Sequence, residues 1–143
     1  MSLPRWSGGL LAAALLAACG GPRPMTLRAQ PPYYSPAMSS ATGIRLTPIF
    51  EPPRGKVVRY RWKTNFGGFV SAGTPFREFP ELVQELELEP ASLYWTYDAR
   101  KVEPLKPPVR IVVEAVDESG AVLARASLRL DWDHDTAHAR ASD

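Results

Sequence analysis

Two stretches near the C-terminus, within residues 109–117 and 122–132, place an apolar side chain at every second position. A β-strand with one buried face has this period, and no other feature of the chain constrains the fold as strongly. Between them, residues 117–120 read Asp-Glu-Ser-Gly, a composition that favours a tight turn with glycine at a position of positive φ. The two stretches therefore predict an antiparallel hairpin.

Shorter segments upstream show the same alternation. From residue 58 to residue 65 the even positions are apolar or threonine, and the odd positions are basic or asparagine. This pattern is typical of a half-buried strand with a basic outer face. Further strands are predicted within residues 44–50, 69–71, 82–89 and 92–97.

Short strands, turns marked by proline and glycine, and the lack of a long helical pattern indicate an all-β protein. We expect an antiparallel immunoglobulin-like β-sandwich of about seven strands over residues 43–133. It would follow a signal peptide (1–18) and a proline-rich segment (19–42), and it would precede a C-terminal tail (134–143).

Three motifs within this region resemble those of the immunoglobulin-like domains of bacterial surface proteins, close to the polycystic-kidney-disease type. They are a Tyr-x-Trp strand ending at Trp62, an aromatic strand at residues 94–97, and a long final hairpin with Asp117 and Gly120 at its turn. The resemblance implies a β-sandwich. Where that family has an acidic Trp-Asp-Phe-Gly-Asp-Gly turn, residues 62–68 read Trp-Lys-Thr-Asn-Phe-Gly-Gly, so no calcium preference is carried over.

The N-terminus has the layout of a secretory signal, with a basic start (Arg5), an apolar run (10–16) and small residues at the cleavage point. The apolar run is shorter than the roughly 20 residues that span a bilayer. Residues 16–19, Leu-Ala-Ala-Cys, resemble the lipobox of bacterial lipoproteins. The resemblance implies diacylglycerol on Cys19, cleavage before it, and acylation of the new amine, with palmitate as the expected fatty acid.

Composition excludes several classes of function. Cys19 is the single cysteine, so a lipidated chain has no thiol left for a disulfide, a nucleophile or a metal. Removal of residues 1–18 leaves 125 residues with a formal net charge of +1, because Arg5 is the only charged residue lost. This balance gives no reason to expect a nucleic-acid partner.

Residues 20–42 are rich in proline, glycine, serine and alanine, and we expect a disordered tether there. Fully extended, such a tether would reach on the order of 70 Å, at about 3.1 Å per residue. Residues 134–143 are small and polar, and we expect them to be a flexible tail.

One candidate binding surface is the basic stripe on the predicted strand within 57–65. Its members are Arg59, Arg61 and Lys63. Residues 85, 87 and 89 form an acidic stripe of the same spacing. If the two strands are neighbours, the stripes would pair, and each exposed pair would contribute about 0–1 kcal/mol. The stripes then serve solubility and edge protection, whereas an unpaired basic stripe would dock a partner.

The aromatic residues allow two interpretations. Trp62, Tyr94, Trp95, Tyr97 and Trp132 could form a platform for a carbohydrate or a peptide. Trp62 and Trp132 fall on the apolar faces of their strands, which favours a core role for both. Tyr94 falls on the opposite side of its strand from Trp95, so we keep it as a candidate binding residue.

The C-terminus holds the only two histidines. Asp133, His134 and His138 could bind a metal if the segment were helical, because His134 and His138 would then share a face. The segment leaves a predicted strand and enters a predicted tail, so the sequence presets no metal-binding geometry, and we expect no cofactor.

No Ser-His-Asp order, phosphate loop or zinc-ligand spacing is present, so we do not expect an enzyme. We expect a non-catalytic lipoprotein that serves as a binding or structural module of the bacterial cell envelope. Its lipid would hold it in the outer membrane, facing the periplasm, and its partner would be an envelope protein or the cell wall. The alternative is a metal- or ligand-responsive accessory protein of an envelope enzyme that uses the C-terminal Asp/His cluster.

Overall fold

The computed structural model describes residues 24–38, 41–71, 82–101 and 107–140. Within these residues the chain forms ten strands and one short 3-10 helix. The elements are β1 (Thr26–Gln30), β2 (Tyr33–Tyr34), β3 (Ile44–Ile49), β4 (Arg59–Thr64), β5 (Gly68–Ser71), β6 (Glu85–Leu88), β7 (Leu93–Thr96), η1 (Ala99–Lys101), β8 (Val109–Val116), β9 (Val122–Asp133) and β10 (Thr136–Arg140).

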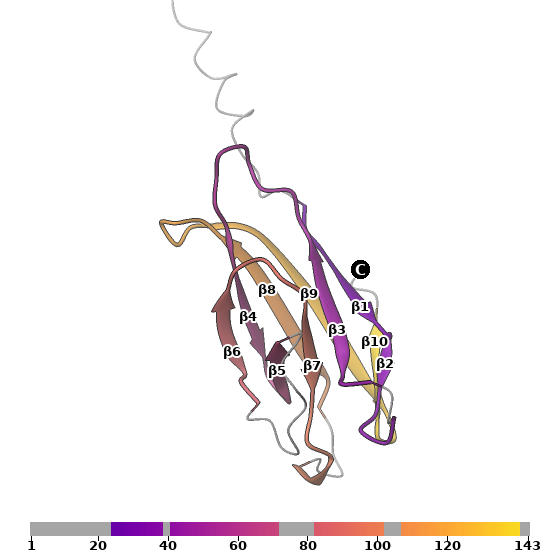
Figure 1. Cartoon of the computed structure of the whole chain (residues 1–143). Coiled ribbons are helices and arrows are strands. Elements are labelled where there is room, and N and C mark those ends of the chain that lie inside the picture. The colour runs from indigo at the N-terminus through magenta and orange to yellow at the C-terminus, as the bar shows by residue number, and fades with distance from the viewer. Residues whose placement is uncertain (1–23, 39–40, 72–81, 102–106, 141–143) are drawn as a thin grey trace, which may run out of the picture.

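The strands form two antiparallel sheets that pack into a β-sandwich (Figure 1). The first sheet has four strands in the order β1-β3-β7-β5. The second has six strands in the order β2-β10-β9-β8-β4-β6. The predicted all-β class and antiparallel sandwich are therefore confirmed.

Seven of the strands have the topology of a constant-type immunoglobulin domain. Taken in chain order as A to G, the strands β1, β3, β4, β5, β7, β8 and β9 form one sheet in the order ABED and the other in the order CFG. Six of these seven strands lie in segments predicted to be strands, and the seventh predicted strand, within 82–89, is β6 at the edge beside β4. The structure adds β1, which lies in the segment expected to be a tether, and it adds β10 and β2 beyond β9.

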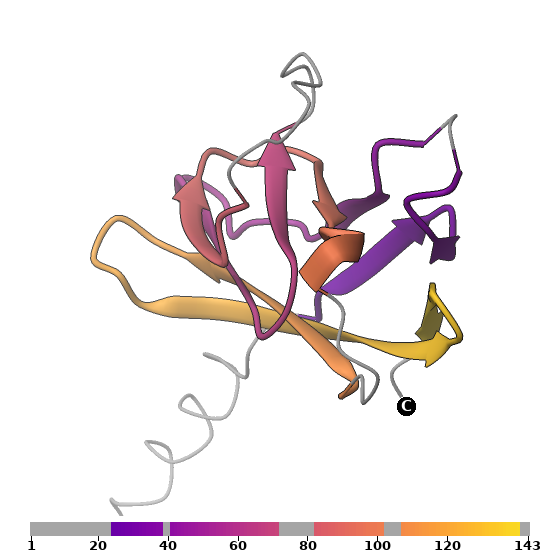
Figure 2. The ribbon, with the colours of Figure 1, turned by 90° about the horizontal axis from the view of Figure 1, so that it is seen from below.

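Buried side chains from the facing surfaces of the two sheets form the core. Trp62 and Trp95 are its largest fully buried members, one from each sheet. The predicted core position of Trp62 is confirmed. Val113 on the neighbouring strand β8 and Leu130 on β9 are also fully buried. Strand β9 passes the whole width of the sandwich, from its hairpin with β8 to its hairpin with β10 (Figure 2).

The predicted hairpin is the β8–β9 pair. Its turn contains Gly120 at φ 83°, the left-handed conformation that glycine adopts without strain. The carboxylate of Asp117 accepts hydrogen bonds from the backbone N–H of Ser119 at 2.9 Å and from that of Ala121 at 3.0 Å. The turn residues thus hold the two strands in register, as the sequence indicated.

The prediction of a disordered tether over 19–42 is wrong for residues 24–38. Strand β1 pairs with β3 along its whole length, and β2 pairs with β10. Met25 and Tyr34 are both buried in the core. Burial of these two side chains against the sandwich supplies the free energy that a proline-rich segment cannot obtain from local structure. The sandwich therefore begins well before residue 43.

The prediction of a flexible tail from residue 134 is also wrong within 134–140. Strand β10 pairs with β9 on one side and with β2 on the other. The turn between β9 and β10 contains His134 at φ 52°. The hydroxyl of Tyr97, which directly follows β7 of the opposite sheet, donates a hydrogen bond to the carbonyl of Asp135. This contact ties the last hairpin to the core.

Candidate interaction surface

The basic stripe predicted on β4 lies on the outer face of the six-stranded sheet, where the acidic stripe of β6 neutralises it. Register places Lys63 opposite Glu85 and Arg61 opposite Glu87. The Nζ atom of Lys63 lies 3.3 Å from Glu85 Oε1. The expected cross-strand pairing of the two stripes is therefore confirmed.

The rest of the stripe is paired in the same way. Arg59 contacts Glu89 at 2.9 Å and Glu87 at 3.3 Å. Arg61 contacts Glu87 at 3.5 Å and, on its other side, Glu114 of β8 at 3.9 Å. Opposite signs thus alternate across β6, β4 and β8, and we call this set of side chains the paired ladder. It favours edge protection over docking at this half of the sheet.

Tyr94, the other candidate binding residue, belongs to β7 in the four-stranded sheet and is half-buried. It lies opposite Arg45 of β3 and Val70 of β5. The structure therefore does not bring Tyr94 together with Arg59, Arg61 and Lys63, which belong to the other sheet.

The remaining aromatic residues pack between the sheets. The rings of Trp95, Tyr97 and Trp132 lie 5.0 to 6.5 Å from one another, and Trp95 and Tyr97 are buried. Burial raises the pKa of the Tyr97 hydroxyl to about 12, so the hydroxyl remains a hydrogen-bond donor at neutral pH. The cluster has the geometry of a core rather than of a binding platform.

The candidate metal ligands do not converge. His134 is 98% exposed in the β9–β10 turn, and His138 lies within β10 with its ring 5.9 Å from the ring of Tyr33. A hairpin, unlike the helix that the metal hypothesis needs, does not stack residues four apart. Among residues with described positions, no group of three His, Cys, Asp or Glu side chains is arranged to hold a metal ion.

A second set of basic residues crosses the other half of the same outer face. Arg110 of β8 lies opposite Arg129 of β9, and Arg129 lies opposite Arg140 of β10. All three side chains are exposed. We call these three residues the arginine row. Sequence analysis missed it because each arginine lies on a different strand, and only the register of three strands aligns them.

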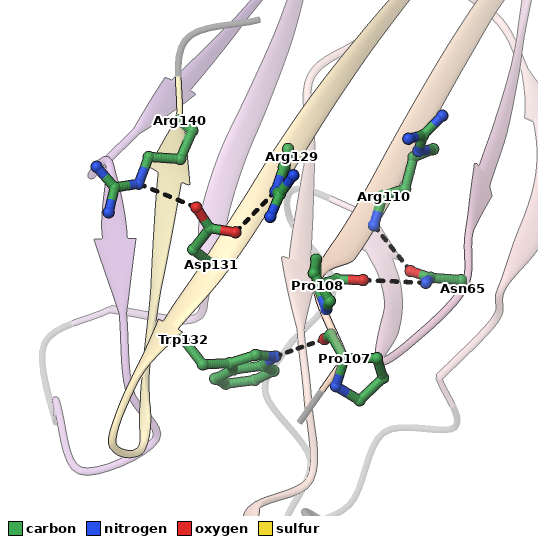
Figure 3. Close-up of polar contacts among 8 residues, drawn as sticks. All are labelled: Asn65, Pro107, Pro108, Arg110, Arg129, Asp131, Trp132 and Arg140. Atoms are coloured by element: carbon green, nitrogen blue, oxygen red, sulfur yellow. Dashed lines mark hydrogen bonds and ion pairs between the residues drawn. The ribbon is translucent and has the colours of Figure 1, made fainter. Parts of the chain in front are cut away.

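One carboxylate serves two members of the arginine row. Asp131 accepts a hydrogen bond from Arg129 Nε at 2.8 Å through one oxygen, and from Arg140 Nε at 3.1 Å through the other (Figure 3). The hydrogen bond from Arg129 is the largest cause that lowers the pKa of the Asp131 carboxyl group. Asp131 therefore remains charged and bridges the two guanidinium groups.

Arg110 is held in place through its backbone. Its N–H donates to Asn65 Oδ1 at 2.8 Å, and the amide of Asn65 donates to the carbonyl of Pro108 at 3.2 Å. The indole N–H of Trp132 donates to the carbonyl of Pro107 at 2.9 Å. These contacts fix the start of β8, as Figure 3 shows. The guanidinium of Arg110 has no ion-pair partner among the described residues.

The proposed lipidation residue, Cys19, lies outside the described residues. Over the parts of the chain that the structure describes, no helix is long and apolar enough to cross a membrane. In comparisons with known proteins, no family model, curated protein or solved structure matches the chain.

Proposed function

We propose that the protein is a non-catalytic lipoprotein of the bacterial cell envelope, with its β-sandwich held close to the membrane by lipid on Cys19. The observation that carries the proposal is the short interval between the lipobox, residues 16–19, and the first strand, which begins at Thr26. A lipobox followed directly by a folded domain is the arrangement of a surface-anchored module.

The length of the linker sets the distance to the membrane. Pro24, the first described residue, follows Cys19 by five residues, and a fully extended chain spans at most ~3.3–3.6 Å per residue. The sandwich would then begin at most about 18 Å from the lipidated residue, far less than the ~70 Å of an extended tether over 20–42. Two or three acyl chains are sufficient to hold such a domain stably.

The sandwich supports a role in binding or structure. Its two sheets share one packed core, and the outer face of the six-stranded sheet presents ordered rows of charged side chains. The rigid strands of an immunoglobulin-like sandwich hold such rows in fixed positions, which suits them to contact a partner. An outer-membrane location facing the periplasm, and an envelope protein or the cell wall as partner, complete the proposal.

The test is partition of the full-length protein between detergent and aqueous phases. Wild-type protein should enter the detergent phase and yield a mature N-terminal peptide that begins at a lipid-modified Cys19. Cys19→Ala should leave the protein aqueous or unprocessed, while the control Gly21→Ala should behave as wild type. Detergent partition that survives Cys19→Ala would refute lipid anchoring through this residue.

A further inference from the structure

The arginine row places three like charges side by side on one sheet face. Residues opposite each other on antiparallel strands have α-carbons about 4.5–5.5 Å apart. Arg110, Arg129 and Arg140 therefore occupy neighbouring positions on three successive strands. Like charges directly opposite each other destabilise a sheet, so this arrangement works against the stability of the fold.

The compensation within the row is incomplete. Asp131 neutralises the side between Arg129 and Arg140, where one carboxylate bridges two guanidinium groups. The side between Arg110 and Arg129 has no equivalent carboxylate within the described ranges. The row thus has a net charge of +2 when Asp131 is ionised.

We propose that the arginine row is the docking site for an acidic segment of a partner protein, whose carboxylate bridges Arg110 and Arg129 as Asp131 bridges Arg129 and Arg140. This inference rests on the proposed role of the domain as a binding module, and it specifies the chemistry of the partner. Planar guanidinium groups match carboxylates in geometry as well as in charge.

The position of the row favours a protein partner over the lipid surface. The described chain begins beside the end of β3, because Thr26 is paired with Ile49. The β3–β4 connection and the β8–β9 turn lie at this same end, and Lys56 and Asp117 join them at 3.3 Å (Figure 1). Arg110 and Arg129 lie toward the opposite end of β8 and β9, away from the point where a lipid anchor would attach.

The row also has an ordered aromatic border. His138 lies opposite Asp131, and its ring lies 5.9 Å from the ring of Tyr33 on β2. Tyr33 is 46% exposed, and few other large apolar side chains among the described residues are as exposed. Its exposed ring, next to the charged row, can pack against the aliphatic part of an acidic side chain.

The test measures binding of a glutamate-rich peptide to full-length protein carrying Cys19→Ala, by calorimetry at low ionic strength. Arg110→Ser and Arg129→Ser should each weaken binding about tenfold or more, the loss expected for one charged hydrogen bond. Arg61→Ser is the matched control, because Arg61 is also exposed on the same face but belongs to the paired ladder. It should leave the affinity unchanged.

A variant that should bind the peptide more tightly distinguishes a change in the binding surface from a loss of folded protein, because a misfolded variant would not gain affinity. Asp131→Ala releases Arg129 and Arg140 from their internal carboxylate, so it should tighten peptide binding several-fold, with a steeper dependence on salt. Equal losses for Arg61→Ser and Arg110→Ser, no peptide binding, or stronger binding to vesicles of anionic phospholipid would each overturn the proposal. Because the soluble variant lacks the anchor, these results are independent of the lipidation test.

Discussion

The two halves of the outer face of the six-stranded sheet follow opposite charge patterns. In the paired ladder, Arg61 lies between Glu87 and Glu114. In the arginine row, Arg129 lies between Arg110 and Arg140. The strands are continuous, and β8 contributes to both halves. The paired charges of the ladder stabilise the sheet. The like charges of the arginine row do not, which is why we propose that they bind a partner.

The comparison assumes that both halves of the sheet pack on one core. Substitution of Trp62 should have the largest effect on the stability of that core. Trp62→Ala should destabilise the protein by about 3–5 kcal/mol, because it empties a fully buried site between the sheets. Denaturant unfolding of the full-length protein measures the effect. Trp62→Phe, which also removes a buried indole N–H that has no hydrogen-bond partner, should cost less. A stable Trp62→Ala variant would contradict a shared core.

The edge beyond the arginine row is the next test. Tyr34→Ala should destabilise the protein by about 3 kcal/mol, because its buried ring anchors β2 and thereby supports β10. The neighbouring Tyr33→Ala is the control and should change stability by no more than about 0.5 kcal/mol, because Tyr33 is exposed. The two variants are compared in the same unfolding assay. Equal effects would mean that β2 contributes no specific packing.

Sequence reasoning recovered the central strands because their alternation was strong. Residues 58–65 and 109–132 each contain a run long enough to identify the buried face, and the structure buries that face. The alternation from Met25 to Gln30 was also present in the sequence, but it is short and lies between prolines. Local signals of that length do not establish a strand until a partner strand is known.

The edges depend on contacts that are distant in sequence. Strand β2 has only two residues and pairs with β10, which lies about a hundred residues further along the chain. Strand β10 is made of small and polar residues, and its only fully buried side chain is Ala137. The arginine row has the same origin, because its three members align only through the registers of β8, β9 and β10.

The β8–β9 turn gives a pH test at the end of the hairpin away from the arginine row. The hydrogen bond from Ser119 is the largest cause that lowers the pKa of Asp117, from 3.8 to about 2. A carboxyl group with a lower pKa in the folded state stabilises the fold above its unfolded pKa, and this contribution is lost as pH falls. Asp117 should therefore contribute fully above about pH 4 and lose its contribution toward pH 2.

Thermal melting of wild type and Asp117→Asn across this range measures the contribution. The difference in melting temperature between the two proteins should shrink as pH falls from about 4 to about 2. Asp117→Asn is a suitable partner for the comparison because the amide keeps the shape of the side chain and has no charge to titrate. A difference that is constant with pH would show that the carboxylate charge has no part in holding the turn.

The opposite charge patterns of the two halves are tested most directly by one substitution made in each half. Arg61→Glu places a carboxylate between Glu87 and Glu114, whereas Arg110→Glu places one opposite Arg129. Both replace an exposed arginine on a strand, so differences in β-propensity largely cancel.

We predict that Arg61→Glu destabilises the fold and that Arg110→Glu stabilises it, each by about 0.2–1 kcal/mol in denaturant unfolding at low salt. The difference should shrink in 1 M NaCl, where the screening length is about 3 Å. Destabilisation of equal size by both substitutions would contradict the account, because the arginine row would then be as well compensated as the ladder.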